Sequence, residues 1–111
     1  MTFLSVCFLL VSLFSFAQDG KRTDTLKVYG NCDMCKKNIE GSLQKSDGVI
    51  SKKWDKDTQI LTVVYHTSKI TIEQIGEKIA SVGYDNRFAT APNEKYNNLH
   101  PCCQYKRPSK S

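Results

Sequence analysis

The chain has 111 residues, with 16 lysines and arginines against 11 aspartates and glutamates, and therefore a formal net charge of +5. This length suits one small domain with one modest core and leaves no room for a second. The positive balance alone does not indicate a nucleic-acid partner, because a solvated basic surface serves solubility equally well.

The first segment, residues 1–17, has the features of a secretory signal. It has no charged residue, an apolar run from Phe3 to Phe16 and the small-residue ending Ser15-Phe16-Ala17, which predicts cleavage after Ala17. The run is shorter than the roughly 18 apolar residues of a membrane anchor, so we expect no stable membrane insertion after cleavage. We therefore expect an exported protein, periplasmic or extracellular.

Four cysteines remain once Cys7 has left with the signal, as the close pairs Cys32/Cys35 and Cys102/Cys103. In an oxidising compartment such residues often form a disulfide framework. Pairs this close in sequence would close very short loops, so local disulfides would stabilise the fold little. That favours a chemical role, although a structural disulfide between Cys32 and Cys35 stays open.

The residues after the signal first alternate like a strand and then take a helical period. Residues 25–30, TLKVYG, place Leu26 and Val28 on one side and end at a glycine, which predicts a first strand. A half-buried helix is predicted from Asn31, ending near Asp47-Gly48. Its apolar residues recur every four positions, at Cys35, Ile39 and Leu43.

Two further strands flank a turn. Residues 49–55 and 59–66 lie on either side of the turn-forming sequence KDT, which predicts a hairpin. The residues of the second strand that share one face are expected in the core: Leu61, Val63 and Tyr65. Trp54, on the shorter strand, is expected to cover an edge of the same core.

Residues 71–83, TIEQIGEKIASVG, form the clearest predicted helix. Thr71 and Gln74 make a capping-box pair, and a glycine ends the segment. Its apolar stripe is expected to face the core, at Ile72, Ile75, Ile79 and Val82. Residues 84–89 are short enough for a final strand.

The predicted order of elements is β-α-β-β-α-β. It fits an α+β, ferredoxin-like βαββαβ sandwich with two helices on one face of a four-stranded antiparallel sheet. We expect the domain to span residues 24–90. The remaining residues, 91–111, are expected to form a polar tail, most of it flexible.

Residues 24–89 resemble the heavy-metal-associated domain, the module of copper chaperones and metal-transporting ATPases. YGNCDMC stands in place of the family's Gly-Met-x-Cys-x-x-Cys loop, and GVISKKWDKDTQILTVVY and IGEKIASVGYD match later landmarks. The family's upstream methionine is replaced by Tyr29 or Gly30, and Met34 stands between the cysteines. By its position in the family, Tyr84 lies near the metal and screens it; a core tyrosine at a strand start is the other interpretation.

The chemistry of Cys32 and Cys35 agrees with this resemblance. A Cys-x-x-Cys loop entering a helix brings two thiols within reach of one ion, and the helix dipole favours their thiolate form. Lys36 and Lys37 add positive charge nearby. Two thiolates without a firmly placed third ligand suit a soft ion of low coordination, above all Cu(I), whereas Zn(II) takes four ligands. Zn(II) stays open as an alternative ion, and so does Hg(II), because exported mercury-binding detoxification proteins resemble this chain almost as well.

These features predict a metal carrier and not an enzyme, binding Cu(I) through Cys32 and Cys35 and passing it on or buffering it. The expected partner is a metal-donating or metal-accepting protein with a thiol site, such as a metal-transporting ATPase or another chaperone. No nucleic-acid partner is expected: an RNA-recognition module shares the element order, but LTVVYH lacks its stacking motif.

A thiol–disulfide oxidoreductase is the rival interpretation, since an exported Cys-x-x-Cys is also a redox motif. A thioredoxin-like protein resembles a longer chain with a proline that faces the motif from a later strand. Here all the prolines, Pro92, Pro101 and Pro108, lie in or beside the tail. The order of elements therefore favours metal binding over redox catalysis.

The tail contains a second group of soft ligands, because His100, Cys102 and Cys103 lie within four positions of one another. Apolar residues that could dock the segment on the domain flank them: Tyr96, Leu99 and Tyr105. The three ligand residues are candidates for a cap over the metal loop or for a second soft-metal site. Adjacent cysteines chelate one ion awkwardly, so a vicinal or mixed disulfide is an equal alternative.

Overall fold

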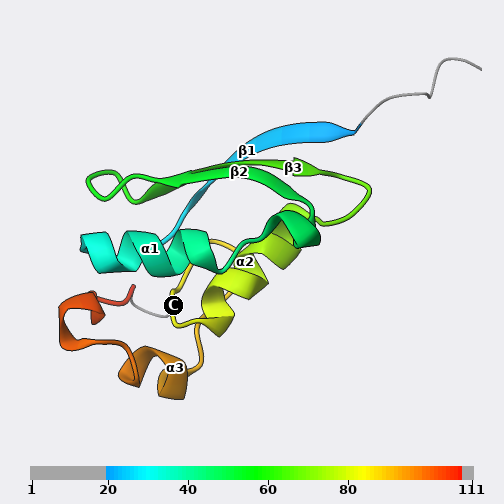
Figure 1. The fold of residues 1–111 in the computed structure, drawn as a ribbon. Coiled ribbons are helices and arrows are strands. Elements are labelled where there is room, and N and C mark those ends of the chain that lie inside the picture. The colour runs from blue at the N-terminus through cyan, green and yellow to red at the C-terminus, as the bar shows by residue number, and fades with distance from the viewer. Residues whose placement is uncertain (1–19, 109–111) are drawn as a thin grey trace, which may run out of the picture.

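In the computed structural model, which describes residues 20–108, an antiparallel sheet is covered on one face by the helices α1 and α2 (Figure 1). The strands are β1 (Lys21–Lys27), β2 (Val49–Trp54) and β3 (Ile60–His66), and the helices are α1 (Asp33–Gly41) and α2 (Ile72–Ser81). A short 3₁₀ turn, η3 (Lys45–Asp47), follows α1. The expected signal, residues 1–17, lies outside the described residues.

The sheet has the order β1-β3-β2, so β3 is its central strand. β1 pairs with β3 from Lys21 opposite His66 to Lys27 opposite Ile60, and therefore begins earlier than the sequence predicts. β2 pairs with β3 up to Trp54 opposite Leu61, which confirms the hairpin. The inward-facing residues of β3 are buried as predicted: Leu61, Val63 and Tyr65.

The prediction of a fourth strand over residues 84–89 is wrong for the described part of the chain, where this segment makes only an isolated bridge between Val28 and Asn86. Asn86 turns the chain instead. Its side-chain amide donates to the carbonyl of Gly76 at 2.8 Å, and its Oδ1 accepts the N–H of Phe88 at 3.0 Å. Backbone hydrogen bonds join residues 85–87 antiparallel to residues 27–29, and the turn held by Asn86 ends the pairing there.

α2 begins at the predicted cap, whereas α1 begins at Asp33 and ends at Gly41, well before the predicted end near Asp47-Gly48. The capping box is present, with the Thr71 side chain accepting from the Gln74 N–H at 3.1 Å and the Gln74 side chain accepting from the Thr71 N–H at 3.0 Å. The stripe of α2 ends early, however, since Val82 lies beyond the helix and is 38% exposed. Leu43 also lies past the end of α1, yet it is fully buried.

Trp54 lies inside the core and not at its edge, as its side chain is fully buried. Its indole Nε1 donates to the carbonyl of Val28 at 3.0 Å, which satisfies the one polar atom of the ring. This contact ties the end of β2 to the residues that lead into the cysteine loop. The buried Trp54 side chain thus supports the segment that leads into the cysteine loop.

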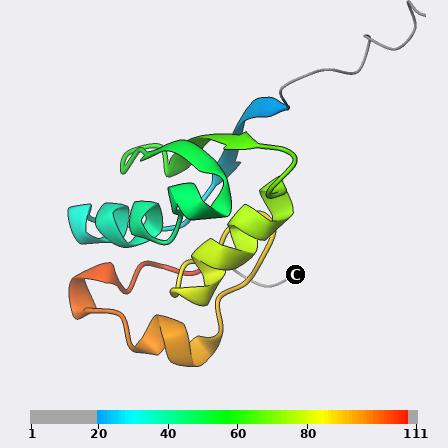
Figure 2. The ribbon, with the colours of Figure 1, turned by 45° about the vertical axis from the view of Figure 1, so that its right-hand side comes forward.

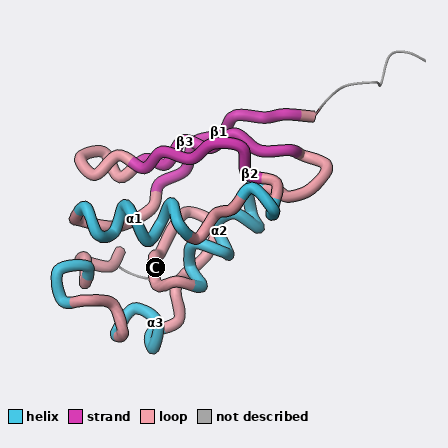
Figure 3. Tube along the Cα trace, in the orientation of Figure 1, coloured by secondary structure: helices cyan, strands magenta, loops and turns pink. Residues whose placement is uncertain are grey.

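The tail forms a third layer on the side of the helices that faces away from the sheet (Figures 1 and 2). It contains two short helical pieces, α3 (Asn93–Asn97) and η4 (Pro101–Cys103), joined by loops (Figure 3). In both views the segment after α3 returns beside the first turn of α1. Cys103 and Tyr105, in the middle of this segment, are buried, as expected if the middle of the tail docks on the domain.

Candidate metal centre

The cysteine loop leads from β1 into α1, and Cys32 is the N-cap residue of that helix. Its backbone is extended, with φ −151° and ψ 172°, and its Sγ accepts the backbone N–H of Cys35 at 3.3 Å. A sulfur thus takes the role that a serine or aspartate oxygen usually has at an N-cap. The helix start therefore fixes both cysteines in relation to each other.

Gly30 lets this loop lie close to the core. A Cβ built on it would meet two ring carbons of Trp54 at 3.0 Å and the Cβ of Cys35 at 3.2 Å. Those distances are shorter than ordinary carbon contacts, so a larger residue would push the loop away from the tryptophan. The close approach of Trp54 and Cys35 thus explains why a glycine stands at position 30.

The Cys32 and Cys35 sulfurs lie 3.1 Å apart as free thiols. Cys35 is fully buried, and its Sγ donates to the side-chain oxygen of Asn31 at 3.3 Å. Cys32 is half-buried and forms the outer member of the pair. Met34, between the two cysteines, is exposed.

The tail brings two more thiols to the same place. The Cys103 sulfur lies 3.2 Å from that of Cys32, and the Cys102 sulfur lies 3.9 Å from it. Cys102 and Cys103 are 3.8 Å apart, so three sulfurs all lie within 4.8 Å of one another. A metal–sulfur bond of about 2.3 Å lets two sulfurs on one ion lie up to about 4.6 Å apart. All these sulfur–sulfur distances are within that reach.

His100 and Tyr84 take other positions. The His100 Nδ1 accepts the backbone N–H of Cys102 at 3.4 Å and caps η4, and among residues 20–108 the ligand group contains sulfurs alone. Tyr84 is fully buried beside the thiols of Cys35 and Cys103, and its hydroxyl accepts from the Asn38 amide at 2.9 Å. It is therefore a core tyrosine that also adjoins the cysteines, and its screening of a bound metal stays a prediction.

The cysteines differ in their acidity. Burial raises the pKa of the Cys32 thiol, but hydrogen bonds from the side chain and backbone of Cys35 and from the two tail thiols outweigh it and lower the pKa to about 7. Burial and the neighbouring Cys32 thiol raise the pKa of Cys103. Burial likewise raises the pKa of Tyr84. Cys32 thus ionises near neutral pH, whereas Cys103 keeps its proton there.

The Lys36 ammonium group binds other residues and is not directed at the thiols. Its Nζ lies 2.8 Å from Glu40 Oε2 and donates to the carbonyl of Trp54, also at 2.8 Å. The Glu40 carboxylate in turn accepts the N–H of Trp54 at 2.9 Å. This lysine therefore joins α1 to the end of β2, which is a structural role.

An ion pair between Asp85 and Arg107 holds the tail in place. The guanidinium binds both carboxylate oxygens, at 2.7 and 2.8 Å, and also donates to the carbonyl of Ala91 at 2.7 Å. Asp85 is almost fully buried. Bidentate arginine–carboxylate pairs with little water access are the strong ones. Nothing in the local sequence pattern marks either residue, which lie 22 positions apart.

Tyr105 provides the second attachment. Its hydroxyl donates to the carbonyl of Gly83 at 2.8 Å and accepts the N–H of Asp85 at 2.7 Å. Its ring stacks on Tyr84 with centroids 5.6 Å apart, and the Tyr96 ring meets it edge-on at 5.0 Å. The docking role expected for Tyr96 and Tyr105 thus agrees with the structure, and Leu99 packs against the same core.

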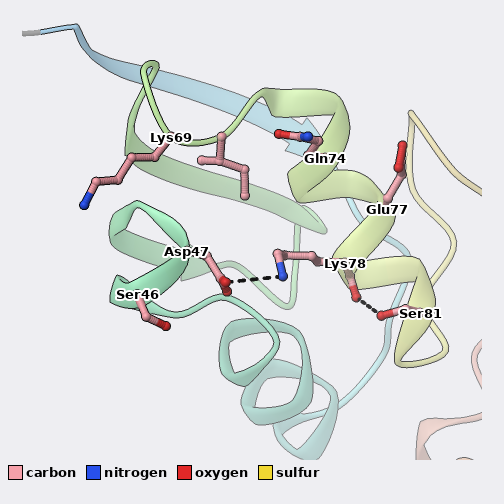
Figure 4. Close-up of a pocket in the computed structure, with 8 residues that line it drawn as sticks. Ser46, Asp47, Lys69, Gln74, Glu77, Lys78 and Ser81 are labelled. Carbon is pink, nitrogen blue, oxygen red and sulfur yellow. Dashed lines mark hydrogen bonds and ion pairs between the residues drawn. The ribbon is translucent and has the colours of Figure 1, made fainter.

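A separate hollow lies between η3 and α2, lined by polar side chains (Figure 4). Lys78 and Asp47 form an ion pair across it at 3.4 Å. It contains none of the cysteines. The hollow therefore has no part in the thiol cluster.

The family model of the heavy-metal-associated domain matches residues 27–85. The chain belongs to the heavy-metal-associated domain family. The match includes Cys32, Cys35 and Tyr84 and ends at Asp85, so the whole tail with Cys102 and Cys103 lies beyond it. The resemblance expected from the cysteine loop is confirmed.

Named relatives of this family align with the same part of the chain. The copper chaperone CopZ of Staphylococcus epidermidis is 38% identical over 61 residues, covering 54% of this chain and 90% of that protein. Copper-transporting ATPase 1 of Rattus norvegicus is 37% identical over 71 residues, covering 63% of this chain but 5% of the ATPase. The solved structure of a CopZ metallochaperone superposes with a TM-score of 0.56 at 31% identity, over 60% of this chain and all of that one.

Proposed function

We propose that this protein is a non-enzymatic carrier of a soft metal ion, most readily Cu(I), which it binds through Cys32 and Cys35. The observation that supports this most directly is the pair of free thiols, 3.1 Å apart at the start of α1. In this geometry both sulfurs reach one ion without any movement of the backbone. The membership of a metal-binding family gives the pair its context.

The donor chemistry favours Cu(I). Thiolates are soft ligands that select Cu(I), zinc and related ions, and a site of few sulfurs suits the ion of lowest coordination number. Relatives that align over most of their own length are named copper chaperones. Zn(II) and Hg(II) bind thiolates as well, so competition among the three ions is part of the test.

The exposure of Cys32 suggests how the ion leaves. Cys32 is the outer ligand and Cys35 the buried one, so an incoming thiol can bond to the ion on the Cys32 side before either sulfur departs. The acceptor would be another thiol site, for instance in a metal-transporting ATPase, a class in which this module also occurs. The net charge of +5 suits an acidic docking face on that acceptor.

The compartment proposed for this exchange is the periplasm or the extracellular space. The proposal rests on the uncharged apolar segment and small-residue ending of residues 1–17. No helix among residues 20–108 is long and apolar enough to cross a bilayer. A processed amino terminus at Gln18 in the purified exported protein would support the assignment, and retention of the segment would contradict it.

Anaerobic titration of the reduced protein with Cu(I), Zn(II) and Hg(II) beside a competing chelator tests the proposal. Tight Cu(I) binding is expected in the natural protein and in Met34→Leu, the control, because Met34 is exposed. The double variant Cys32→Ser/Cys35→Ser is expected to lose it. Tight binding retained by the double variant would overturn the assignment, and catalytic reduction of insulin disulfides by the natural protein would favour the redox alternative.

A further inference from the structure

We propose that Cys102 and Cys103 are metal ligands and that, together with Cys32, they form a second, three-thiolate position for the same soft ion. This position adjoins the Cys32–Cys35 pair and shares one sulfur with it. The inference deepens the proposed carrier function, on which it rests. It concerns a segment outside residues 27–85, the part that the family model matches.

The geometry of the three sulfurs fits a trigonal site. With metal–sulfur bonds of about 2.3 Å, three ligands around one ion lie about 4.0 Å from each other. The Cys32–Cys102 and Cys102–Cys103 distances are 3.9 and 3.8 Å. The Cys32–Cys103 distance, 3.2 Å, is shorter by less than about 1 Å, within the range of a small χ1 rotation.

Adjacent cysteines usually chelate one ion awkwardly, but Cys102 and Cys103 lie on a 3₁₀ turn that lets both sulfurs face the same ion. η4 contains both residues, and His100 and Pro101 form its start. The turn directs both sulfurs toward Cys32 while Cys103 is fully buried and Cys102 is exposed. One ligand is therefore fixed by packing, and the other is open to the solvent from which an ion arrives.

The rest of the tail holds this arrangement. Two residues that follow η4 attach the tail to the domain. Tyr105 binds Gly83 and Asp85, and Arg107 binds Asp85. The Tyr96 hydroxyl donates to the carbonyl of Tyr105. Because these contacts involve buried polar groups with their partners in place, the tail has a defined position relative to the cysteine loop. The fold therefore holds the sulfurs of Cys32 and Cys103 next to each other.

The shared sulfur gives the second position a function. An ion held by Cys32 and Cys35 can acquire Cys102 and Cys103 as ligands before Cys35 is released, so it need never leave the protein. Three thiolates hold a soft ion more firmly than two, and binding displaces the thiol protons. The tail thus retains the ion when no acceptor is present, and the open pair presents it when an acceptor thiol arrives.

X-ray absorption of the reduced full chain with one equivalent of Cu(I) measures the number of sulfurs bound. Three sulfurs per copper are expected in the natural protein and two in Cys102→Ser, with an affinity at least tenfold lower in competition with a chelator. Because Cys102 is exposed, this variant is not expected to disturb the fold. Cys102→Ser/Cys103→Ala is expected to behave in the same way.

Cys35→Ser separates this inference from the proposed function. The three-thiolate position remains in that variant, so Cu(I) binding with three sulfurs is expected to persist. It is expected to disappear when Cys102→Ser and Cys103→Ala are added. Unchanged sulfur number and affinity in Cys102→Ser would overturn the tail site and leave the carrier function standing. Unchanged binding in Cys32→Ser/Cys35→Ser would overturn the carrier site itself.

Discussion

The sulfurs of Cys32 and Cys103 lie 3.2 Å apart although the two residues are 71 positions apart in the chain. One belongs to the loop that opens α1, and the other to a turn beyond the end of the family match. The thiol cluster is therefore made by the closure of the tail onto the domain. Substitutions that affect either the cysteine loop or the attachment of the tail should therefore alter the geometry of the thiol cluster.

Gly30→Ala is expected to destabilise the protein by about 1–3 kcal/mol, since the added methyl would press on Trp54 and Cys35. Denaturant unfolding of the reduced, metal-free protein measures this. Gly41→Ala is the matched control, because nothing lies within 4 Å of a Cβ at that helical position. It is expected to be neutral or to stabilise by up to about 1 kcal/mol. Equal effects of the two substitutions would contradict the steric account of Gly30.

Tyr105→Phe is expected to cost about 1–3 kcal/mol in the free energy of unfolding. It removes the hydroxyl that pairs with the Gly83 carbonyl and the Asp85 N–H, and leaves both backbone groups buried without a partner. The aromatic stack on Tyr84 is kept, so the loss reports on the hydrogen bonds. Tyr29→Phe is the control, because it removes the hydroxyl of a half-buried tyrosine and keeps the ring under the Lys27 ammonium, 5.6 Å from the centroid. An unchanged stability of Tyr105→Phe would show that water replaces the hydroxyl.

Arg107→Met is expected to destabilise by about 3 kcal/mol, because it leaves the buried Asp85 carboxylate without its counter-ion. The same variant should raise the rate at which a thiol reagent modifies Cys103, since the tail then opens more often. Arg22→Met, whose guanidinium is exposed in the pair with Asp24, is the control and should cost less than about 1 kcal/mol. If Cys103 reacted no faster in Arg107→Met, the ion pair would not be what closes the tail.

The stability of the metal-free protein is expected to fall in acid through Asp85. Burial raises the pKa of this carboxyl, but Arg107 and the Ala91 N–H outweigh it and keep the pKa below its ordinary range. A lowered pKa adds stability above the unfolded-state value, about 3.9, and this is lost as the pH falls through the folded-state value. Unfolding free energies from pH 7 down to pH 2 should therefore drop most steeply below about pH 4.

Asp85→Asn should show a shallower acid slope, since it has no proton to take up at this site. Asp57→Asn, which removes an exposed carboxylate in the turn after β2, is the control and should keep the natural slope. A slope for Asp85→Asn as steep as that of the natural protein would place the acid sensitivity elsewhere, for example at Glu40, whose pKa is also lowered although burial raises it.

Local patterns account for most of the domain. The alternation of β3, the capping box of α2 and the spacing of Cys35 and Ile39 in α1 all depend on residues close in sequence. The same holds for the cysteine loop, because its position between a strand and a helix was enough to predict a metal-binding motif. These features could be predicted because each one is a period or a short motif.

The features that were missed, or that the sequence left open, depend on contacts between distant residues. Asn86 stops the final strand by bonding to Gly76, and no propensity of residues 84–89 shows this in advance. The order of the tail depends on Arg107 finding Asp85 and on Tyr105 stacking on Tyr84. Polar composition suggested flexibility, but a few specific side chains decide the outcome. The meeting of Cys102 and Cys103 with Cys32 follows from them.

Asp85 is both the last residue of the family match and the residue that binds Arg107. A domain boundary chosen there by homology would cut through the ion pair and remove the ring that covers Tyr84. The excised fragment would contain a buried carboxylate with no counter-ion and an open tyrosine face. Poor folding or weak metal binding of such a fragment would then say nothing about the thiols. In this chain the folding unit extends to Arg107, so single substitutions report on the tail where truncation cannot.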